Sequence, residues 1–295
     1  MKLISYCKVC FTLLLTLVSC SREKVELINP NTQSLPYDII INGGILTMNG
    51  KQFVQITKPL AWITDTVMPV SGAVVELSDG ENTYLYKETS KPGEYETVLD
   101  IKGEVGKVYT LKVSFNGKLY LASDSLIEAK PISVDEIPIE EIDYDETGRI
   151  YTHMHTHIFG FETSNIWIIN KQHIDSLGNL FLPQLCPKRI IRYDYLPVYT
   201  HKGVLHQGLF PSGFTSIGNA GAPEDTTEYA KLSVSDSYYK YLISIFNITE
   251  WSSGLFSTTL GNALTNVSNG GAGYFFASDV KTIKVQYKDL TALSK

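Results

Sequence analysis

Short runs of alternating apolar and polar residues dominate the chain between residues 37 and 126. From Lys107 to Ser114, the side chains of Tyr109, Leu111 and Val113 alternate with polar ones. A period of two places them on one face of a strand. Turn signals separate these runs at Asn49-Gly50, Asp79-Gly80 and Asn116-Gly117, and Gly43-Gly44 interrupts the first run. This pattern predicts a β-sandwich of the immunoglobulin-like or transthyretin-like type over residues 37–128.

The second half of the chain is less regular and contains one clear helical pattern. Apolar side chains at 238, 241, 242, 245 and 248 recur at helical spacing, and Ser235 suits the N-cap. Strands are expected at Thr163–Asn170 and Lys281–Gln286. Residues 175–230 are rich in loop-forming residues and carry no assignment. The sequence therefore predicts a mainly β protein, in which a β-rich domain over residues 150–295 contains one amphipathic helix at about 235–250.

The N-terminal residues 1–19 have the features of an export signal. Lys2 and Lys8 are followed by an apolar run from Val9 to Ser19, which is too short to span a bilayer. Leu17-Val-Ser-Cys20 then resembles the lipobox of bacterial lipoproteins, which implies lipidation of Cys20. The alternative is an ordinary signal peptide followed by a chance cysteine.

The chain beyond Cys20 predicts an anchored protein. Residues 20–36 are polar and contain two prolines, which suits a tether. No later stretch has 18 consecutive apolar residues, so attachment through the acyl chains is expected in place of a spanning helix. Cys186 is left without a cysteine partner once Cys7 and Cys10 leave with the signal. A buried inert thiol at Cys186, and no disulfide framework, is the expectation.

The net charge of the chain limits which kinds of molecule it is expected to bind. Loss of Lys2 and Lys8 with the signal leaves 23 basic and 31 acidic side chains, a net charge of −8. This balance disfavours nucleic-acid binding. Seven carboxylates lie between Asp135 and Glu146, inside a junction at residues 129–149. A solvated acidic linker is the preferred interpretation; the alternative is a calcium site, although the EF-hand spacing fails after its second ligand.

Half of the six histidines lie within five residues, at His153, His155 and His157. If residues 151–158 form one strand, all three imidazoles share a face. Neighbours on that face are about 6.6 Å apart and the outer two about 13 Å, whereas nitrogens bound to one zinc ion lie roughly 3.5 Å apart. Two of them can therefore share an ion only with a further ligand, from a carboxylate or from His173, His201 or His206. The alternative is a solvated strand face.

Other candidate chemistry is weaker. Gly270-Gly-Ala-Gly273 is not followed by the helix of a phosphate-binding loop, so a tight corner before a strand is expected. Gly208-Leu-Phe-Pro-Ser-Gly213 does not match the nucleophile elbow G-x-S-x-G. No catalytic residues and no cofactor are predicted. A ligand groove could be lined by aromatic side chains of the middle region, at Tyr193, Tyr195, Tyr199 and Phe210.

Several motifs carry a resemblance to known families. Gly72-Ala-Val-Val75, Pro92-Gly-Glu-Tyr95 and Gly106–Leu111 occur in the order found in carboxypeptidase-regulatory-like sandwiches. Asn266–Phe275 reads N-x-x-N-G-x-x-G-x-F. With the lipobox, the junction and the helix, this order resembles the Bacteroidota outer-membrane lipoproteins grouped as domain of unknown function 4249. The resemblance implies an outer-membrane location, on either the periplasmic face or the cell surface, and the company of TonB-dependent transporters.

Three functions follow as hypotheses. The first is a non-enzymatic lipoprotein, anchored through Cys20, that acts as an accessory or ligand-binding component of a TonB-dependent transporter. The second is a metal-binding protein or metalloenzyme that uses His153, His155 and His157. The third is a structural or adhesive surface module.

Overall fold

The computed structural model describes residues 37–60, 66–170, 195–203, 216–249 and 263–293. Contacts divide the chain into two units, Met1–Leu35 and Pro36–Lys295, and every described residue belongs to the second. Within these ranges no helix is both long and apolar enough to cross a membrane. The signal, Cys20, the tether and Cys186 lie outside the described residues.

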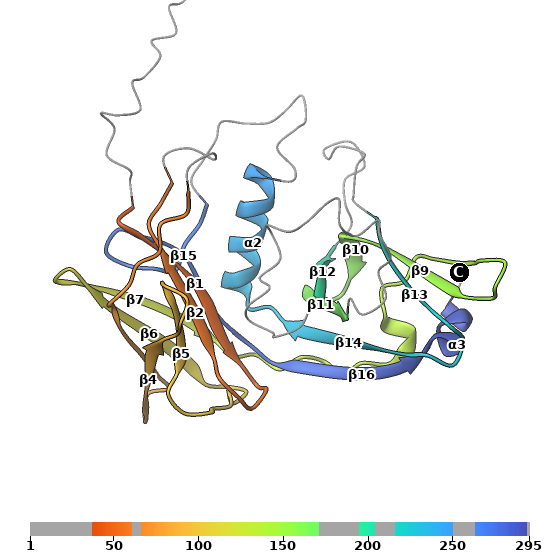
Figure 1. Ribbon diagram of the computed structural model, residues 1–295, viewed down its shortest axis with the longest axis horizontal. Coiled ribbons are helices and arrows are strands. Elements are labelled where there is room, and N and C mark those ends of the chain that lie inside the picture. The colour runs from red at the N-terminus through yellow and green to blue at the C-terminus, as the bar shows by residue number, and fades with distance from the viewer. Residues whose placement is uncertain (1–36, 61–65, 171–194, 204–215, 250–262, 294–295) are drawn as a thin grey trace, which may run out of the picture. The chain divides into compact units, whose positions relative to one another are not determined.

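The largest sheet has eight strands in the order β15-β1-β2-β5-β4-β3-β6-β7 (Figure 1). Its neighbours are antiparallel except for the parallel pair β15 and β1. In β6, Tyr109, Leu111 and Val113 are buried, as the alternation predicts. The strands of this sheet are β1 (Ile39–Leu46), β2 (Phe53–Thr57), β3 (Val74–Ser78), β4 (Thr83–Glu88), β5 (Glu94–Thr97), β6 (Val108–Phe115), β7 (Lys118–Ser125) and β15 (Gly271–Ser278).

The strand β15 comes from the C-terminal part of the sequence. It runs beside β1 in Figure 1, with Ile39 opposite Gly271 and Leu46 opposite Ser278. Just before β15, Val267 forms a β-bridge with Ala122 in β7. The segment from Val267 to Ser278 therefore contacts β1 and β7, the first and last strands of residues 37–128. The division of the chain into domains at residues 37–128, 129–149 and 150–295 stays a prediction. The pairings of Val267 and β15 join strands from the first and the last of these ranges.

Two turn predictions in the N-terminal sheet have different outcomes. Asn116-Gly117 forms the expected two-residue turn between β6 and β7, with φ angles of 49° and 75°. Strands β1 and β2 form an antiparallel hairpin, but the two-residue turn predicted at Asn49-Gly50 is wrong, because the connection runs from Thr47 to Gln52 and Gly50 bridges to Ile101. The Gln52 side chain replaces the turn's own hydrogen bonds by accepting from Leu46 N and donating to Ile101 O.

Strand β1 continues through Gly43-Gly44, where the sequence predicts an interruption. A Cβ at Gly43 would lie 2.4 Å from the Phe53 carbonyl oxygen, and one at Gly44 would lie 2.4 Å from the Phe276 carbonyl oxygen. The two glycines therefore allow β2 and β15 to approach β1 closely from either side. Their presence reflects tertiary packing and not a turn.

Two further sheets follow, in the orders β10-β12-β11-β14-β16 and β13-β9-β8. Trp167 and Tyr229 are fully buried on the five-stranded sheet, and Met154 is buried on the three-stranded one. Their strands are β8 (Glu141–Tyr144), β9 (Ile150–His155), β10 (His157–Phe161), β11 (Asn165–Asn170), β12 (Tyr195–Lys202), β13 (Ser216–Gly221), β14 (Thr226–Ser233) and β16 (Val280–Gln286).

The acidic junction is partly ordered, whereas the sequence predicts a solvated linker. It contains the 3-10 turn η2 (Val134–Glu136) and the strand β8. Ile137 and Ile139 are buried in the core formed by Trp167 and Tyr229. Apolar side chains placed between the carboxylates thus anchor this segment, while Glu141 and Asp143 point to solvent.

The mainly β fold with an amphipathic helix is confirmed. Helix α2 spans Asp236–Ile248, and the Ser235 hydroxyl accepts a hydrogen bond from Tyr238 N, as expected of an N-cap. Tyr238 and Phe246 form its buried face. A short α3 (Tyr287–Leu290) and the 3-10 turn η3 (Thr291–Leu293) follow β16, and the sequence predicts neither.

Candidate functional site

The three clustered histidines do not share one strand. Strand β9 ends at His155, and β10 begins at His157 in a different sheet. Within that sheet, His157 pairs in register with Tyr199 of β12. The expectation of three imidazoles on one strand face is therefore wrong for His157, because the chain changes sheets at Thr156.

His153 and His155 lie on the outer face of β9, each beside one carboxylate. His153 Nε2 is 3.2 Å from Asp143 Oδ2 in β8, and His155 Nδ1 contacts Glu140 Oε2. Gly218 of β13 faces His153 from the other side. Each imidazole therefore forms a separate pair with a carboxylate that helps to hold the acidic strand β8 on β9.

His157 instead meets His201, a residue that the sequence analysis names as a further ligand. The distance from His157 Nδ1 to His201 Nε2 is 3.0 Å. The two side chains are 3% and 2% exposed, so the contact is inside the protein. Burial, with a smaller effect of the neighbouring His157, lowers the pKa of His201 to about 3. His201 is therefore neutral over the physiological range.

Among the described residues, no three His, Cys, Asp or Glu side chains come together as ligands for a metal ion. His173 and His206 lie outside the described residues. Of the aromatic residues proposed to line a groove, Tyr199 is half-buried and packs on His157 and Phe246. Tyr193 and Phe210 lie outside the described residues, as does the side chain of Tyr195.

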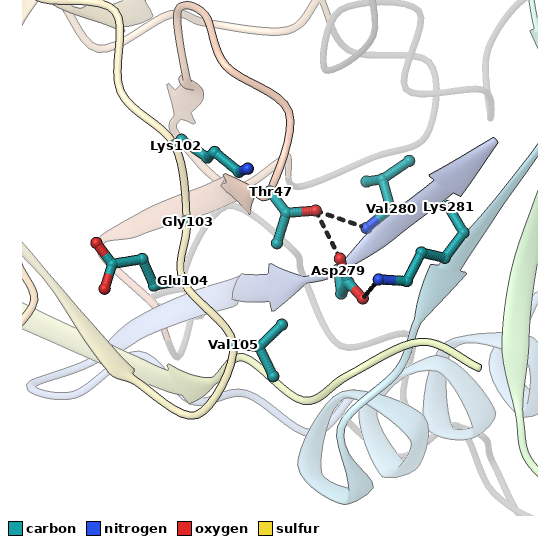
Figure 2. Close-up of a pocket in the computed structure, with 8 residues that line it drawn as sticks. All are labelled: Thr47, Lys102, Gly103, Glu104, Val105, Asp279, Val280 and Lys281. Carbon is teal, nitrogen blue, oxygen red and sulfur yellow. Dashed lines mark hydrogen bonds and ion pairs between the residues drawn. The ribbon is translucent and has the colours of Figure 1, made fainter. Parts of the chain in front are cut away.

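A polar recess lies where the start of β16 meets two loops of the N-terminal sheet. It encloses about 370 Å³, and Figure 2 shows the side chains around it. The lining residues come from three stretches: Thr47; Lys102, Gly103, Glu104 and Val105; and Asp279, Val280 and Lys281. This size suits a small ligand or one end of a larger one.

Asp279 lies at the bottom of the recess and binds three neighbouring groups. Its carboxylate accepts hydrogen bonds from the Thr47 hydroxyl at 2.7 Å and the Ala129 amide at 2.9 Å, and it pairs with Lys281 Nζ at 2.9 Å (Figure 2). Burial alone would raise the pKa of Asp279, but these three donors lower it below its ordinary value. The carboxylate is thus ionised and its charge is balanced within the protein.

Lys102 is a cationic side chain of the recess that is not neutralised by a carboxylate of the described residues. It has no ion-pair partner among the described residues, and its side chain extends towards Thr47 in Figure 2. The nearby Glu104 points away from Asp279 and lies 3.2 Å from Lys107 Nζ. Since Asp279 and Glu104 both have cationic partners, Lys102 favours an anionic or strongly polar ligand group.

The late N-x-x-N-G-x-x-G-x-F motif has a structural role. The Asn266 side chain donates to the carbonyls of Ser123 and Phe275 and accepts from Phe275 N. The Asn269 side chain donates to Leu119 O, and a Cβ at Gly273 would lie 2.0 Å from the Ile41 carbonyl oxygen. The motif therefore joins β7, β15 and β1. The predicted tight corner is confirmed, with φ of 56° at Asn269 and 80° at Gly270.

Two buried aspartates form interactions that no sequence motif indicates. Asp124 is 4% exposed and Asp279 is 3% exposed, and both bind segments far away in the sequence. The available signal at Asp124 is its inward position in β7, between the buried Ala122 and the sheet end. An ionisable side chain at a core position of an alternating strand indicates a buried polar network.

Comparisons with known proteins give a family match for the N-terminal half of the chain only. No curated protein matches this chain. Solved structures with some similarity include a pullulanase from Anoxybacillus sp. LM18-11, at 10% identity over 69% of this chain and with a TM-score of 0.17. The same pullulanase complexed with maltotriose is similar at 11% identity over 71% of this chain, also with a TM-score of 0.17. This chain spans about a quarter of the length of those chains, 26% in each case, and so weak a likeness carries no argument about fold or function.

The sequence itself shows a clearer relationship. Residues 25–164 match the profile of a family that has a number but no assigned activity. The match covers the N-terminal sheet up to β7, the acidic junction and the strands β8 to β10. This part of the chain therefore matches the model of a domain of unknown function, DUF4249, in agreement with the resemblance seen in the sequence motifs.

Proposed function

We propose that this protein is an outer-membrane lipoprotein, anchored through Cys20, that serves as a non-enzymatic accessory or ligand-binding component of a TonB-dependent transporter. The domain over residues 37–128 is proposed to be an immunoglobulin-like sandwich of the carboxypeptidase-regulatory-like type. The proposal combines an anchor at one end of the chain with a binding surface on the folded unit.

The observation that carries the proposal is Leu17-Val-Ser-Cys20 after a basic and apolar leader. A diacylated or triacylated cysteine buries many CH₂ groups, each contributing about 0.8 kcal/mol, which holds a protein on a membrane without a spanning helix. The 16 residues of sequence from Ser21 to Pro36 are polar, which suits a tether between lipid and fold.

The recess supports a binding role. It brings Lys102 and Lys281 to the same opening, and its floor is set by the hydrogen-bonded Asp279. Loops that connect strands commonly carry recognition because a rigid sheet positions them while their sequence remains free to vary. An anionic group on a transported compound, or on a loop of the transporter, would find a complementary charge at Lys102.

Membrane fractionation tests the anchor. Full-length wild-type protein and Cys10→Ala are expected in the outer-membrane fraction, whereas Cys20→Ala is expected to move to the soluble fraction. Cys10→Ala is the matched control because it removes a cysteine of the leader and leaves the lipobox intact. Retention of Cys20→Ala on the membrane to the wild-type level would refute the lipid anchor.

A pull-down from detergent-solubilised membranes tests the partner. Tagged wild-type protein is expected to recover a TonB-dependent β-barrel transporter, at a ratio that does not change when the tag is moved to the other end of the folded unit. Recovery of no transporter by a protein that is correctly anchored would contradict the accessory role and favour a structural or adhesive module.

A further inference from the structure

Apolar side chains are exposed at one end of the N-terminal sheet, in the segment that leads to β3. Val67 and Met68 are 54% and 52% exposed, and Pro69 beside them is also exposed. The Lys58 amide donates a hydrogen bond of 2.8 Å to the Met68 carbonyl oxygen, which places this segment against the end of β2. Exposed apolar side chains that lie together are typical of a surface that contacts another molecule or a membrane.

Two lysines flank these apolar side chains. Lys58 follows β2, and Lys91 belongs to the turn in which a Cβ at Gly93 would lie 2.8 Å from the Cβ of Pro69. Both lysines are exposed, and no carboxylate of the described residues forms an ion pair with either. Glu88, a carboxylate beside the same turn, instead accepts a hydrogen bond of 2.7 Å from the Gly93 amide. The entry surface is defined here as Lys58, Val67, Met68, Pro69 and Lys91.

The chain enters the fold at the same end of the sheet. Ile40 near the start of β1 pairs with Thr57 at the end of β2, and 16 residues of sequence separate Tyr37 from Cys20. Even a fully extended chain of that length spans about 55 Å at most. The opposite end of the sheet, where Leu99 is 69% exposed, is about 26 Å further away, because β1 has eight residues. A fold anchored at Cys20 is therefore attached through the end that carries the entry surface.

We propose that the entry surface rests on the lipid bilayer, with Val67 and Met68 among the lipid headgroups and the ammonium groups of Lys58 and Lys91 on lipid phosphates. Aliphatic side chains gain free energy when they leave water for the boundary of the acyl chains, and anionic lipids attract lysines near the surface. Two lysines and two aliphatic side chains are too few to hold a soluble protein on a membrane. The inference therefore rests on the proposed anchor at Cys20, to which this surface adds a second, orienting contact.

Contact through the entry surface sets the direction in which the recess opens. The recess is lined by Thr47, which directly follows the end of β1, and by Lys102 in a loop at the same end. The entry surface lies at the other end, beside the start of β1 and the end of β2. A bilayer in contact with the entry surface therefore leaves the recess on the side of the N-terminal sheet that is turned away from the lipid.

Electron spin resonance on membrane-bound protein tests the contact. Mature lipidated protein carries Cys186→Ser, which leaves no other free thiol, and a spin label at Met68→Cys or, as the matched control, at Leu99→Cys. It is reconstituted into vesicles of phosphatidylethanolamine and phosphatidylglycerol that contain no transporter. The label at position 68 is expected to collide severalfold more often with oxygen, which concentrates in lipid, than the label at position 99. It is expected to collide severalfold less often with a water-soluble nickel chelate.

Charge reversal tests the part played by the two lysines. Lys58→Glu combined with Lys91→Glu is expected to move the label at position 68 towards water, because the new carboxylates repel phosphatidylglycerol. Lys240→Glu combined with Lys284→Glu changes the net charge by the same amount at exposed lysines of α2 and β16. This control is expected to leave the label at its original depth. Equal effects of the two pairs would overturn the contact between the lysines and lipid phosphates.

Flotation of the same vesicles separates this inference from the proposed anchor. Protein that floats with the vesicles, but whose label at position 68 meets the nickel chelate as often as the label at position 99, would overturn the lipid contact and leave the anchor in place. A label shielded from both reagents would indicate a contact with protein and would overturn the lipid contact as well. Protein that does not float would refute the anchor, and this inference with it.

Discussion

The Ser235 hydroxyl donates a hydrogen bond of 2.7 Å to Asp124 Oδ1 across 111 residues of sequence. Ser235 is also the N-cap of helix α2, and Asp124 lies in β7 of the N-terminal sheet. The same carboxylate accepts from the Ser125 amide at Oδ1 and from the Ala277 amide at Oδ2. The buried side chain of Asp124 thus holds the start of α2 and the end of β15 against β7.

Replacement of Asp124 by Asn is expected to destabilise the protein strongly. Both carboxylate oxygens accept from backbone amides, so the amide group of Asn would face an N–H donor in either orientation. Leaving such donors unsatisfied in the interior predicts a loss of about 3 kcal/mol in the free energy of unfolding. Urea denaturation measures it. Asp100→Asn, at a side chain that is 60% exposed, is the control and should change stability by less than about 0.5 kcal/mol.

A double-mutant cycle isolates the contact between Asp124 and Ser235. Ser235→Ala removes the cap of α2 as well as the hydrogen bond to Asp124, which predicts a loss of about 1–2 kcal/mol on its own. Because the two residues touch, the double variant should lose less than the sum of the single losses, by roughly 1 kcal/mol. Additive losses would show that the two side chains act independently.

Gly273→Ala is expected to disrupt the pairing of β15 with β1. Its Cβ would lie 2.0 Å from the Ile41 carbonyl oxygen, and its φ of 88° disfavours other residues. Gly148 has a similar φ of 81° but nothing within 4 Å of its Cβ position, so Gly148→Ala measures the backbone cost alone. That cost is about 1 kcal/mol, and Gly273→Ala should exceed it by at least ~2 kcal/mol because backbone must move. Equal losses in thermal or chemical unfolding would refute the close approach.

Acid should weaken the fold through His201. The pKa of His201 is lowered from 6.5 to about 3, so the unfolded chain takes up a proton in this window that the folded protein does not. The stabilising contribution is therefore complete above pH 6.5 and is lost as the pH falls towards 3, by up to about 1.4 kcal/mol per pH unit. His201→Phe should flatten the stability profile in that window. An unchanged slope would show that His201 is accessible to protons in the folded state.

The local elements were the most predictable. Helix α2 follows from the spacing of Tyr238, Tyr241 and Leu242 with Ser235 before them, and the Asn116-Gly117 turn follows from the tolerance of both residues for positive φ. Both signals act within a few residues. The parallel pairing of β15 with β1 was not predictable, since nothing near Gly273 in the sequence identifies Ile41 as its neighbour.

The histidine cluster likewise shows that the sequence pattern does not reveal tertiary contacts. The alternation from His153 to His157 continues through Thr156, yet the chain passes from one sheet to another there. What separates His157 from the other two is its register with Tyr199 of β12, which is a tertiary contact. The sequence supplies His201 as one of several possible partners, and only the fold selects it.

Cross-linking in intact cells tests the central claim, that the lipid-anchored chain works beside a transporter. An amine-reactive cross-linker reaches exposed lysines such as Lys102, and mass spectrometry identifies the joined peptides. The account predicts cross-links between this chain and a TonB-dependent β-barrel, which disappear in Cys20→Ala cells at equal protein abundance. Cross-links that form only within the wild-type chain or between its copies would contradict it.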